Sequence, residues 1–159
     1  MKLARLECNG TQVSDLSPLK GMPLTALFIH VTKVADLSPL KGMKLASLDC
    51  NDTQVSDLSP LKDMKLTYLG CGYTQVSDLS PLKDMKLWRL DCCYSKVADL
   101  TSLTGMQLQD IRFTPKNITK GIEVVHEMKS LKIIGIGWAA KDQWPADEFW
   151  KKFDAGEFK

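Results

Sequence analysis

The sequence predicts a right-handed α/β solenoid, in which parallel strands form one face and short turns form the other. Three observations indicate this fold. A unit of 21 residues occurs five times in succession between Leu3 and Gln107. One stretch of it, Thr-Gln-Val-Ser-Asp-Leu-Ser-Pro-Leu-Lys, is repeated letter for letter at 11–20, 53–62 and 74–83. Seven positions are apolar in every unit, and one unit cannot bury them alone, so the copies are expected to stack.

Each unit begins with a predicted strand. From the second leucine onward its residues alternate between apolar and polar or small, as in Leu66-Thr67-Tyr68-Leu69-Gly70-Cys71. This alternation is typical of a strand with one buried face. Strands that recur once per unit predict a parallel sheet. The units begin at Leu3, Leu24, Leu45, Leu66 and Leu87.

A tight turn is predicted after each strand, in the Asp-Leu-Ser-Pro-Leu segment. In the first unit Ser17 is a candidate N-cap and Pro18 suits the first helical position. Gly21 follows soon after and can end the turn. Only a short 3₁₀-helix or a single α-helical turn fits in this space.

The pattern changes after the fifth unit. Leu108, Ile111 and Phe113 keep the strand pattern, but the apolar residues of 117–128 have helical spacing and predict a helix. Residues 131–138 predict the last strand.

An aromatic segment follows, and it is bulky enough to cover the open core of a terminal unit. Its residues 144–150 are predicted to open a short helix that also carries Phe153. We therefore divide the chain into five regular units at 1–107, two degenerate units with one helix at 108–138, and a C-terminal aromatic cap at 139–159. All three parts are expected to form one solenoid domain.

The repeated unit resembles the leucine-rich repeat of the short, internalin-like bacterial kind, whose units also carry an Asp-x-x-Pro-Leu turn after the strand. The resemblance covers residues 3–138 and implies parallel strands on a concave face and short turns on a convex face. The C-terminal tail resembles tails that follow such repeats in bacterial proteins that can carry serine/threonine kinase domains.

Two positions of the unit depart from the family pattern. The ninth position has a hydroxyl group where the family usually has asparagine, and hydroxyls can still bind nearby backbone groups. The sixth position is mostly cysteine where the family has its third strand leucine. The ninth-position residues are Thr11, Thr32, Thr53, Thr74 and Ser95, and the sixth-position residues are Cys8, Ile29, Cys50, Cys71 and Cys92.

Metal binding and catalysis are not expected. The sixth-position cysteines form a line inside the predicted core, and a linear array cannot make a tetrahedral zinc site. Cys93 and His30 both fall at the seventh position and are expected to face outward, but three units, or about 14 Å, would separate them. A nucleophile and its base need direct contact. We therefore expect no enzyme activity, no catalytic residue and no cofactor.

Composition and charge argue against a nucleic-acid-binding protein. The formal net charge of +2 does not favour nucleic acid. Lysines form a recurring row along the turn edge, but a matching row of aspartates favours a solvated edge over a stripe that tracks phosphates. The lysines are Lys20, Lys41, Lys44, Lys62, Lys65, Lys83 and Lys86, and the aspartates are Asp15, Asp36, Asp57, Asp78 and Asp99.

The N-terminal residues lead to two expectations, one about the cellular location of the protein and one about its self-association. They show no signal-peptide pattern, so we expect a cytoplasmic protein without membrane contact. The first unit starts at Leu3 with nothing in this sequence to shield it. That suggests a segment of a longer protein, and self-association through the uncapped first repeat.

Variation between the units indicates a binding surface. The turns are nearly invariant, whereas the outward positions of the strands differ and carry aromatic and charged residues in the later units. Tyrosine, tryptophan and arginine dominate interface energetics, although relaxed drift on an exposed surface would also produce variation. We predict a non-enzymatic module that binds a protein through its concave face, with a structural or regulatory segment of a larger signalling protein, for example a kinase, as the alternative. The predicted partner-binding residues are Tyr68, Tyr73, Trp88, Arg89, Asp91, Tyr94, Arg112 and Trp138.

Overall fold

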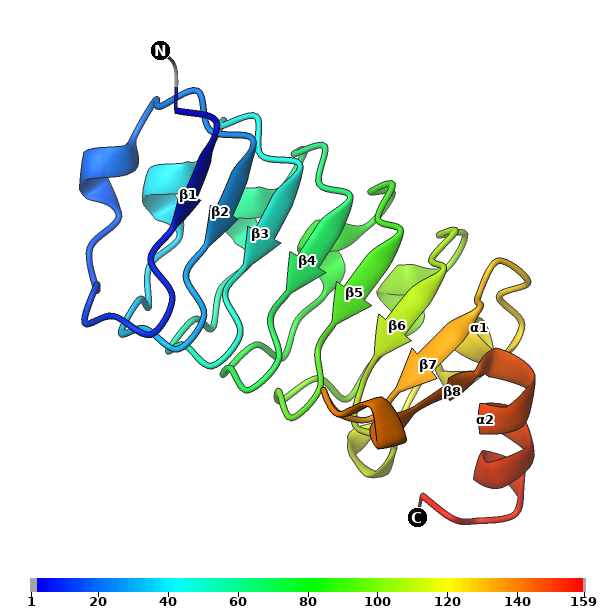
Figure 1. Cartoon of the computed structure of the whole chain (residues 1–159). Coiled ribbons are helices and arrows are strands. Elements are labelled where there is room, and N and C mark those ends of the chain that lie inside the picture. The colour runs from blue at the N-terminus through cyan, green and yellow to red at the C-terminus, as the bar shows by residue number, and fades with distance from the viewer. Residues whose placement is uncertain (1–2, 159) are drawn as a thin grey trace.

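The structure, a computed structural model, describes residues 3–158 and shows a curved stack of strands and turns (Figure 1). The strands form one 8-stranded sheet whose order follows the sequence. Pairing is parallel from β1 to β7, and β8 returns antiparallel to β7. The predicted parallel sheet is therefore confirmed. The strands are β1 (Arg5–Glu7), β2 (Ala26–Phe28), β3 (Ser47–Asp49), β4 (Tyr68–Gly70), β5 (Arg89–Asp91), β6 (Asp110–Arg112), β7 (Ile133–Gly135) and β8 (Gln143–Pro145).

The register of the sheet aligns equal positions of successive repeats. Leu6 lies opposite Leu27, and Leu27 lies opposite Leu48. Because this shift equals one repeat, each repeat position becomes a row that runs along the stack. A residue type that recurs at one repeat position therefore forms a row of side chains along the stack.

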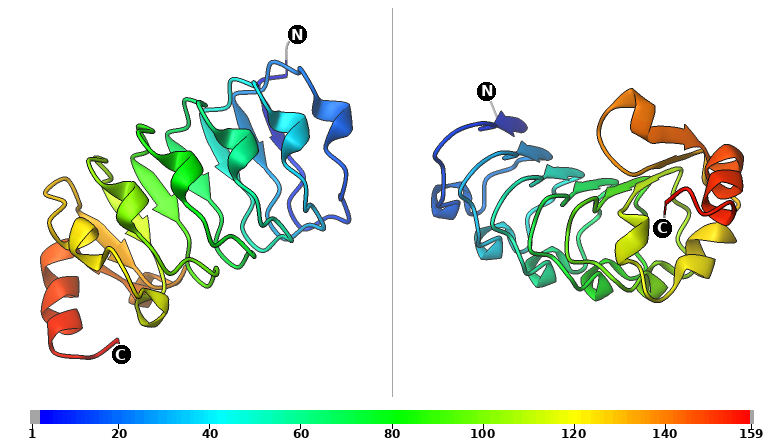
Figure 2. Two further views of the ribbon diagram at one scale, coloured as in Figure 1. Left: turned by 180° about the vertical axis from the view of Figure 1, so that it is seen from behind. Right: turned by 90° about the horizontal axis from the view of Figure 1, so that it is seen from below.

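Short 3₁₀ turns cover the outer side of the curve, opposite the strands (Figure 2). The turn type is as predicted, but Ser17 does not cap its turn. Instead Ser17 lies inside the turn, and the carboxylate of Asp15 accepts its N–H at 2.8 Å. The turns are η1 (Ser17–Leu19), η2 (Ser38–Leu40), η3 (Ser59–Leu61), η4 (Ser80–Leu82), η5 (Thr101–Leu103) and η6 (Pro115–Asn117).

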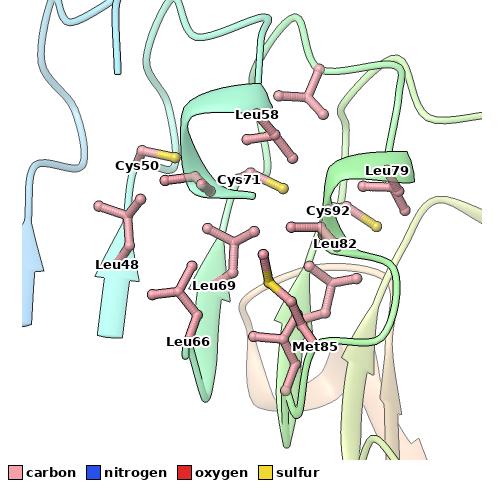
Figure 3. Close-up of a cluster of buried hydrophobic side chains, with 14 of the residues drawn as sticks. Leu48, Cys50, Leu58, Leu66, Leu69, Cys71, Leu79, Leu82, Met85 and Cys92 are labelled. Atoms are coloured by element: carbon pink, nitrogen blue, oxygen red, sulfur yellow. The ribbon is translucent and has the colours of Figure 1, made fainter. Parts of the chain in front are cut away.

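An apolar core runs between the strands and the turns (Figure 3). Cys50, Cys71 and Cys92 are buried in it, as predicted, whereas Cys8 in the first unit is half-buried. The ninth-position hydroxyls bind the chain as expected: Oγ1 of Thr53, for example, donates to the carbonyl of Cys50 at 2.7 Å. The same bond recurs at Thr11, Thr32, Thr74 and Ser95.

The eighth position of each regular unit turns the chain sharply as it leaves the strand. Its φ angle is positive in all five units, at Gly10, Val31, Asp52, Tyr73 and Tyr94. L-residues other than glycine, asparagine and aspartate rarely adopt this left-handed conformation. The turn places the eighth side chain at the rim of the concave face.

The C-terminal part differs from the sequence prediction in three places. The strand expected over 131–138 is shorter, because β7 ends at Gly135. The helix expected over 117–128 is shorter: α1 spans Ile122–His126 and begins after Gly121, whose φ is 81°. Trp144 and Pro145 do not open a helix, because they lie in β8, where Trp144 pairs with Ile134. After β7 the chain makes the turn η7 (Ala140–Asp142), then β8, then α2 (Ala146–Asp154).

The helix α2 covers the last strands with aromatic side chains, which confirms the predicted helical cap. Phe149 is fully buried. Its ring lies 5.9 Å from that of Phe113, the sixth-position residue of the degenerate repeat, and 4.9 Å from that of Phe158. Among residues 3–158, no helix has the length and apolar character needed to cross a lipid bilayer.

Candidate partner-binding surface

Three exposed aromatic side chains lie together at the rim of the sheet, and the middle one contacts the other two. Tyr73 and Tyr94 hold the eighth position of consecutive units, and their rings stack with centroids 4.6 Å apart. The ring of Trp138 lies 5.1 Å from that of Tyr73. Each of the three is 43–47% exposed. We call Tyr73, Tyr94 and Trp138 the aromatic ladder.

Trp138 reaches Tyr73 because the chain folds back between β7 and β8 (orange in the right view of Figure 2). Its indole Nε1 donates to Oδ2 of Asp91 at 2.8 Å. Arg112 Nη2 donates to Oε1 of Gln143 at 2.8 Å, and Gln143 Nε2 donates to the carbonyl of Trp138 at 3.2 Å. This returning loop, residues 136–142, therefore holds Trp138 against the fourth repeat.

A polar pocket of about 220 Å³ opens beside the ladder. We call it the concave pocket. Its lining comes from the third, fifth and seventh positions of the repeats and from the returning loop. The lining residues are His30, Asp49, Asn51, Tyr68, Arg89, Asp91, Arg112 and Trp138.

Two glycines create the room for this pocket. A Cβ atom at Gly70 would lie 2.6 Å from Nδ2 of Asn51 and 2.8 Å from the hydroxyl of Tyr68. A Cβ atom at Gly72 would lie 2.8 Å from a backbone carbonyl oxygen of the next unit. The tyrosine hydroxyl passes over Gly70 and donates to Oδ2 of Asp49 at 3.3 Å. Side chains at these two positions would fill the hollow.

The two arginines of the pocket share the carboxylate of Asp110, which lies outside the lining. Oδ2 of Asp110 lies 3.4 Å from Nε of Arg89, and its Oδ1 lies 3.8 Å from Nε of Arg112. Burial raises the pKa of Asp91, although hydrogen bonds from the N–H of Cys93 and the indole of Trp138 oppose the shift. Burial also raises the pKa of Tyr68, and the neighbouring charge of Asp49 adds to that shift.

Seven of the eight residues predicted for partner binding lie in the ladder or the pocket. Trp88 is the exception: it is exposed at the second position and lies by a separate hollow between repeats, beside Met85 and Gln107. Asp91 and Arg112 are buried, so they position neighbours and offer little surface to a partner. His30, Asp49 and Asn51 were not predicted as part of the surface, because their units are three and two repeats removed from the aromatic residues of the fifth unit.

The prediction that Cys93 faces outward is wrong. Cys93 is fully buried, and its Sγ lies 3.6 Å from the carbonyl oxygen of Phe113. The strand alternation ends before the seventh position, because the left-handed eighth residue turns the chain there. Side chains at the seventh position of the repeats instead make contacts to the next repeat. Asn9 accepts the N–H of His30, and Asn51 accepts the N–H of Gly72.

Cys93 and His30, which the unit spacing was expected to keep apart, contact different groups, and Sγ of Cys93 lies by the carbonyl oxygen of Phe113. The imidazole of His30 lies beside Asp49, with Nδ1 at 3.7 Å from Oδ2. Within residues 3–158, no group of three or more histidine, cysteine, aspartate or glutamate side chains could hold a metal ion. The lysines of the turn edge lie at the surface.

Comparison with solved structures identifies the fold. Internalin C2 from Listeria monocytogenes matches 83% of this chain and 70% of its own length, with a TM-score of 0.59 and 22% sequence identity. Another internalin of that organism, InlF, matches 85% of this chain and 61% of its own length, with a TM-score of 0.52 and 21% identity. The chain thus has the internalin-like leucine-rich repeat fold. No protein-family model and no curated protein sequence matches it.

Proposed function

We propose that this chain is a non-enzymatic module that binds a protein partner through the aromatic ladder and the rim of the concave pocket. Leucine-rich repeat solenoids typically serve protein–protein interaction, because their curved stacks form extended concave surfaces. The observation that carries the proposal is the contact between three exposed aromatic rings drawn from separate repeats. Tyrosine and tryptophan dominate interface energetics.

Pre-organisation adds to this argument. Side chains that are mobile before binding lose entropy when a partner fixes them. The rings of Tyr73 and Tyr94 already stack, and a hydrogen bond to Asp91 holds the indole of Trp138. The ladder therefore offers a large apolar area at a low entropic cost.

The alternative is a structural or regulatory repeat segment of a larger signalling protein. The observation that favours it is the set of bonds between Trp138, Asp91 and Gln143, which a purely structural role would also explain. The two roles differ in what Tyr94 does. Its side chain is exposed, and Tyr73 is its one aromatic ring contact in the described part of the chain, so a structural role gives it little importance.

A pull-down from the source cell with the repeat chain as bait tests the proposal. Tyr94→Ala and Arg89→Glu are each expected to weaken capture of the specific partner by about 2 kcal/mol or more. Lys62→Glu on the exposed turn edge is the control and should change capture little. Loss of capture with Lys62→Glu alone would move the binding surface to the lysine row. Equal capture by all variants would contradict binding through the ladder, and capture of no specific partner would favour the structural alternative.

A further inference from the structure

The hydrogen-bonding groups that remain free in the concave pocket are mainly donors. Nε of Arg89 lines the pocket and is buried without a hydrogen-bond partner among residues 3–158, and so is Nδ1 of His30, which is a donor only when it carries the ring proton. Nε of Arg112, also lining the pocket, is in the same condition, and so is one acceptor, Oδ1 of Asp110, which lies 3.8 Å from that nitrogen. Buried donors without acceptors are costly, so an incoming acceptor would gain from pairing with them.

The carboxylates that line the pocket are already engaged. Asp49 accepts the N–H of Asn51 at 3.1 Å and the hydroxyl of Tyr68 at 3.3 Å. Asp91 accepts the N–H of Cys93 at 3.1 Å and the indole N–H of Trp138 at 2.8 Å. An incoming cation would therefore have to compete with existing bonds for both groups.

Arg89 is the least committed charge in the pocket. In the described part of the chain its one ion-pair contact is the 3.4 Å approach to Asp110, a carboxylate that it shares with Arg112. Its guanidinium lies over the ring of Tyr68, with Cζ at 5.5 Å from the centroid. The ring limits the directions that the guanidinium can take, and the side chain remains 27% exposed at the pocket mouth.

We propose that the concave pocket receives a carboxylate side chain, from an aspartate or glutamate of the partner protein, with Arg89 as its anchor. This inference rests on the proposed function, because it names the group that the partner inserts beside the aromatic ladder. A guanidinium can bind a carboxylate through two parallel hydrogen bonds. The free volume of about 220 Å³ is large enough for one side chain.

Short peptides test the pocket without any partner protein. The probes are tripeptides with blocked ends, glycine–X–glycine, in which X is glutamate, glutamine or lysine. Nuclear magnetic resonance reports binding through the backbone amides of Gly70 and Gly72 and the Nε–H of Arg89. The glutamate peptide is expected to shift these signals to saturation, with an affinity about tenfold or more above that of the glutamine and lysine peptides. Added salt should weaken it.

Arg5 supplies a matched control. It holds the third position of its unit as Arg89 does, and its guanidinium also covers an aromatic ring, with Cζ at 4.3 Å from the centroid of Phe28. Arg5, however, pairs with Glu7 at 2.6 Å in the open, outside the pocket. Arg89→Met should lower the affinity for the glutamate peptide about tenfold, and Arg5→Met should leave it unchanged. Arg89→Lys, which keeps the charge next to Asp110, should give an intermediate affinity if the fork geometry matters.

Several results would overturn the proposal. These are stronger binding of the lysine peptide, equal shifts with glutamate and glutamine, and no shift with any peptide near its solubility limit. Undiminished glutamate binding in folded Arg89→Met would also overturn it. The peptide experiment contains no partner protein, so its failure would contradict the carboxylate pocket and would leave the ladder as a protein-binding surface. The pull-down with Tyr94→Ala tests the ladder separately.

Discussion

Val31 shows how strictly the repeat fixes its backbone. A β-branched residue is a genuine outlier at positive φ, yet Val31 adopts a φ of 56°, close to the 66° of Gly10 in the preceding unit. The left-handed conformation costs an L-residue about 1–2 kcal/mol. Tyr73 and Tyr94 bear a similar strain at the same position, and such strain often collects at functional sites.

Relief of this strain gives the first prediction. Asparagine tolerates the left-handed region better than valine, so Val31→Asn should raise the free energy of unfolding by about 0.5–1 kcal/mol. Denaturant unfolding measures this change in the free energy of unfolding. Lys33→Asn, at an exposed neighbour without a positive φ, is the control and should give no gain. A less stable Val31→Asn protein would show that the valine side chain contributes more than the strain costs.

Thiol reactivity gives a second prediction. Burial, with a smaller contribution from the charge of Asp91, raises the pKa of the Cys93 thiol, and burial likewise raises that of Cys50 and Cys92. A thiol reagent reacts with an accessible thiolate. In the native protein at neutral pH, half-buried Cys8 should therefore be labelled first, and Cys93 should be as slow as Cys50. Mass spectrometry of labelled peptides measures the order, and early labelling of Cys93 would contradict its place in this fold.

At the scale of one element, each of the 3₁₀ turns η1 to η5 is stabilised by an aspartate that comes just before it. Asp57 accepts the hydroxyl of Ser59 at 2.7 Å and its N–H at 2.7 Å. These bonds, the hydroxyl first, lower the pKa of Asp57, and the same cause lowers the pKa of Asp15, Asp36 and Asp99. A lowered folded-state pKa means that the ionised carboxylate stabilises the native turn.

The sign of the pH dependence follows from that shift. The contribution of each aspartate is fully present above its unfolded pKa of about 4 and is lost as the pH falls through the lower folded pKa. An asparagine in place of Asp36 or Asp57 cannot titrate, although its amide oxygen can still accept an N–H. The Asp36→Asn, Asp57→Asn double variant should therefore be less stable than the wild type at neutral pH. Thermal unfolding should show a smaller loss of Tm on acidification in the double variant, and parallel curves would contradict this account.

The regular elements could be predicted from the sequence because each repeat carries the same local signals. The leucines of 66–71 and the serine and proline of η3 define a strand and a turn within one unit. Two features were missed. The burial of Cys93 follows from the sharp turn at Tyr94, and the strand β8 forms because Trp144 pairs with Ile134. The apolar periodicity could reveal neither one, because it carries no sign of a positive φ at a tyrosine and because Trp144 lies beyond the repeating pattern.

The candidate site, like the fold, could be predicted from the sequence in part. The row of outward positions indicated Tyr68, Tyr73 and Tyr94 directly. The contribution of Gly70 and the position of Trp138 were not predictable, because one depends on the space that a missing Cβ atom leaves, and the other on the path of the returning loop.

At the scale of the whole molecule, the first strand leaves one edge of the sheet unpaired within the described residues. The N–H of Cys8 bonds to the carbonyl of Phe28, so the alternation of the strand turns the N–H of Glu7 toward the free edge. Leu3 is 45% exposed beside it. Unpaired strand edges favour association with another chain.

Self-association through β1 is therefore expected at high concentration. Glu7→Pro removes the outward N–H without removing the bond from Cys8 to β2, so it should lower the association. Light scattering over a concentration series measures the change. A wild-type chain that stays monomeric into the millimolar range would contradict this prediction, as would unchanged association of a folded Glu7→Pro variant.

The central claim is that a protein partner binds the aromatic ladder and the concave pocket, and hydrogen exchange of the chain with and without its recovered partner tests it most directly. Buried interfaces slow the exchange of backbone amides. The account predicts protection over 68–73, 89–94 and 136–143, with little change along the lysine row at 41–44 and 62–65. Protection confined to the lysine row and the 3₁₀ turns would contradict the claim and place the binding surface on the convex side.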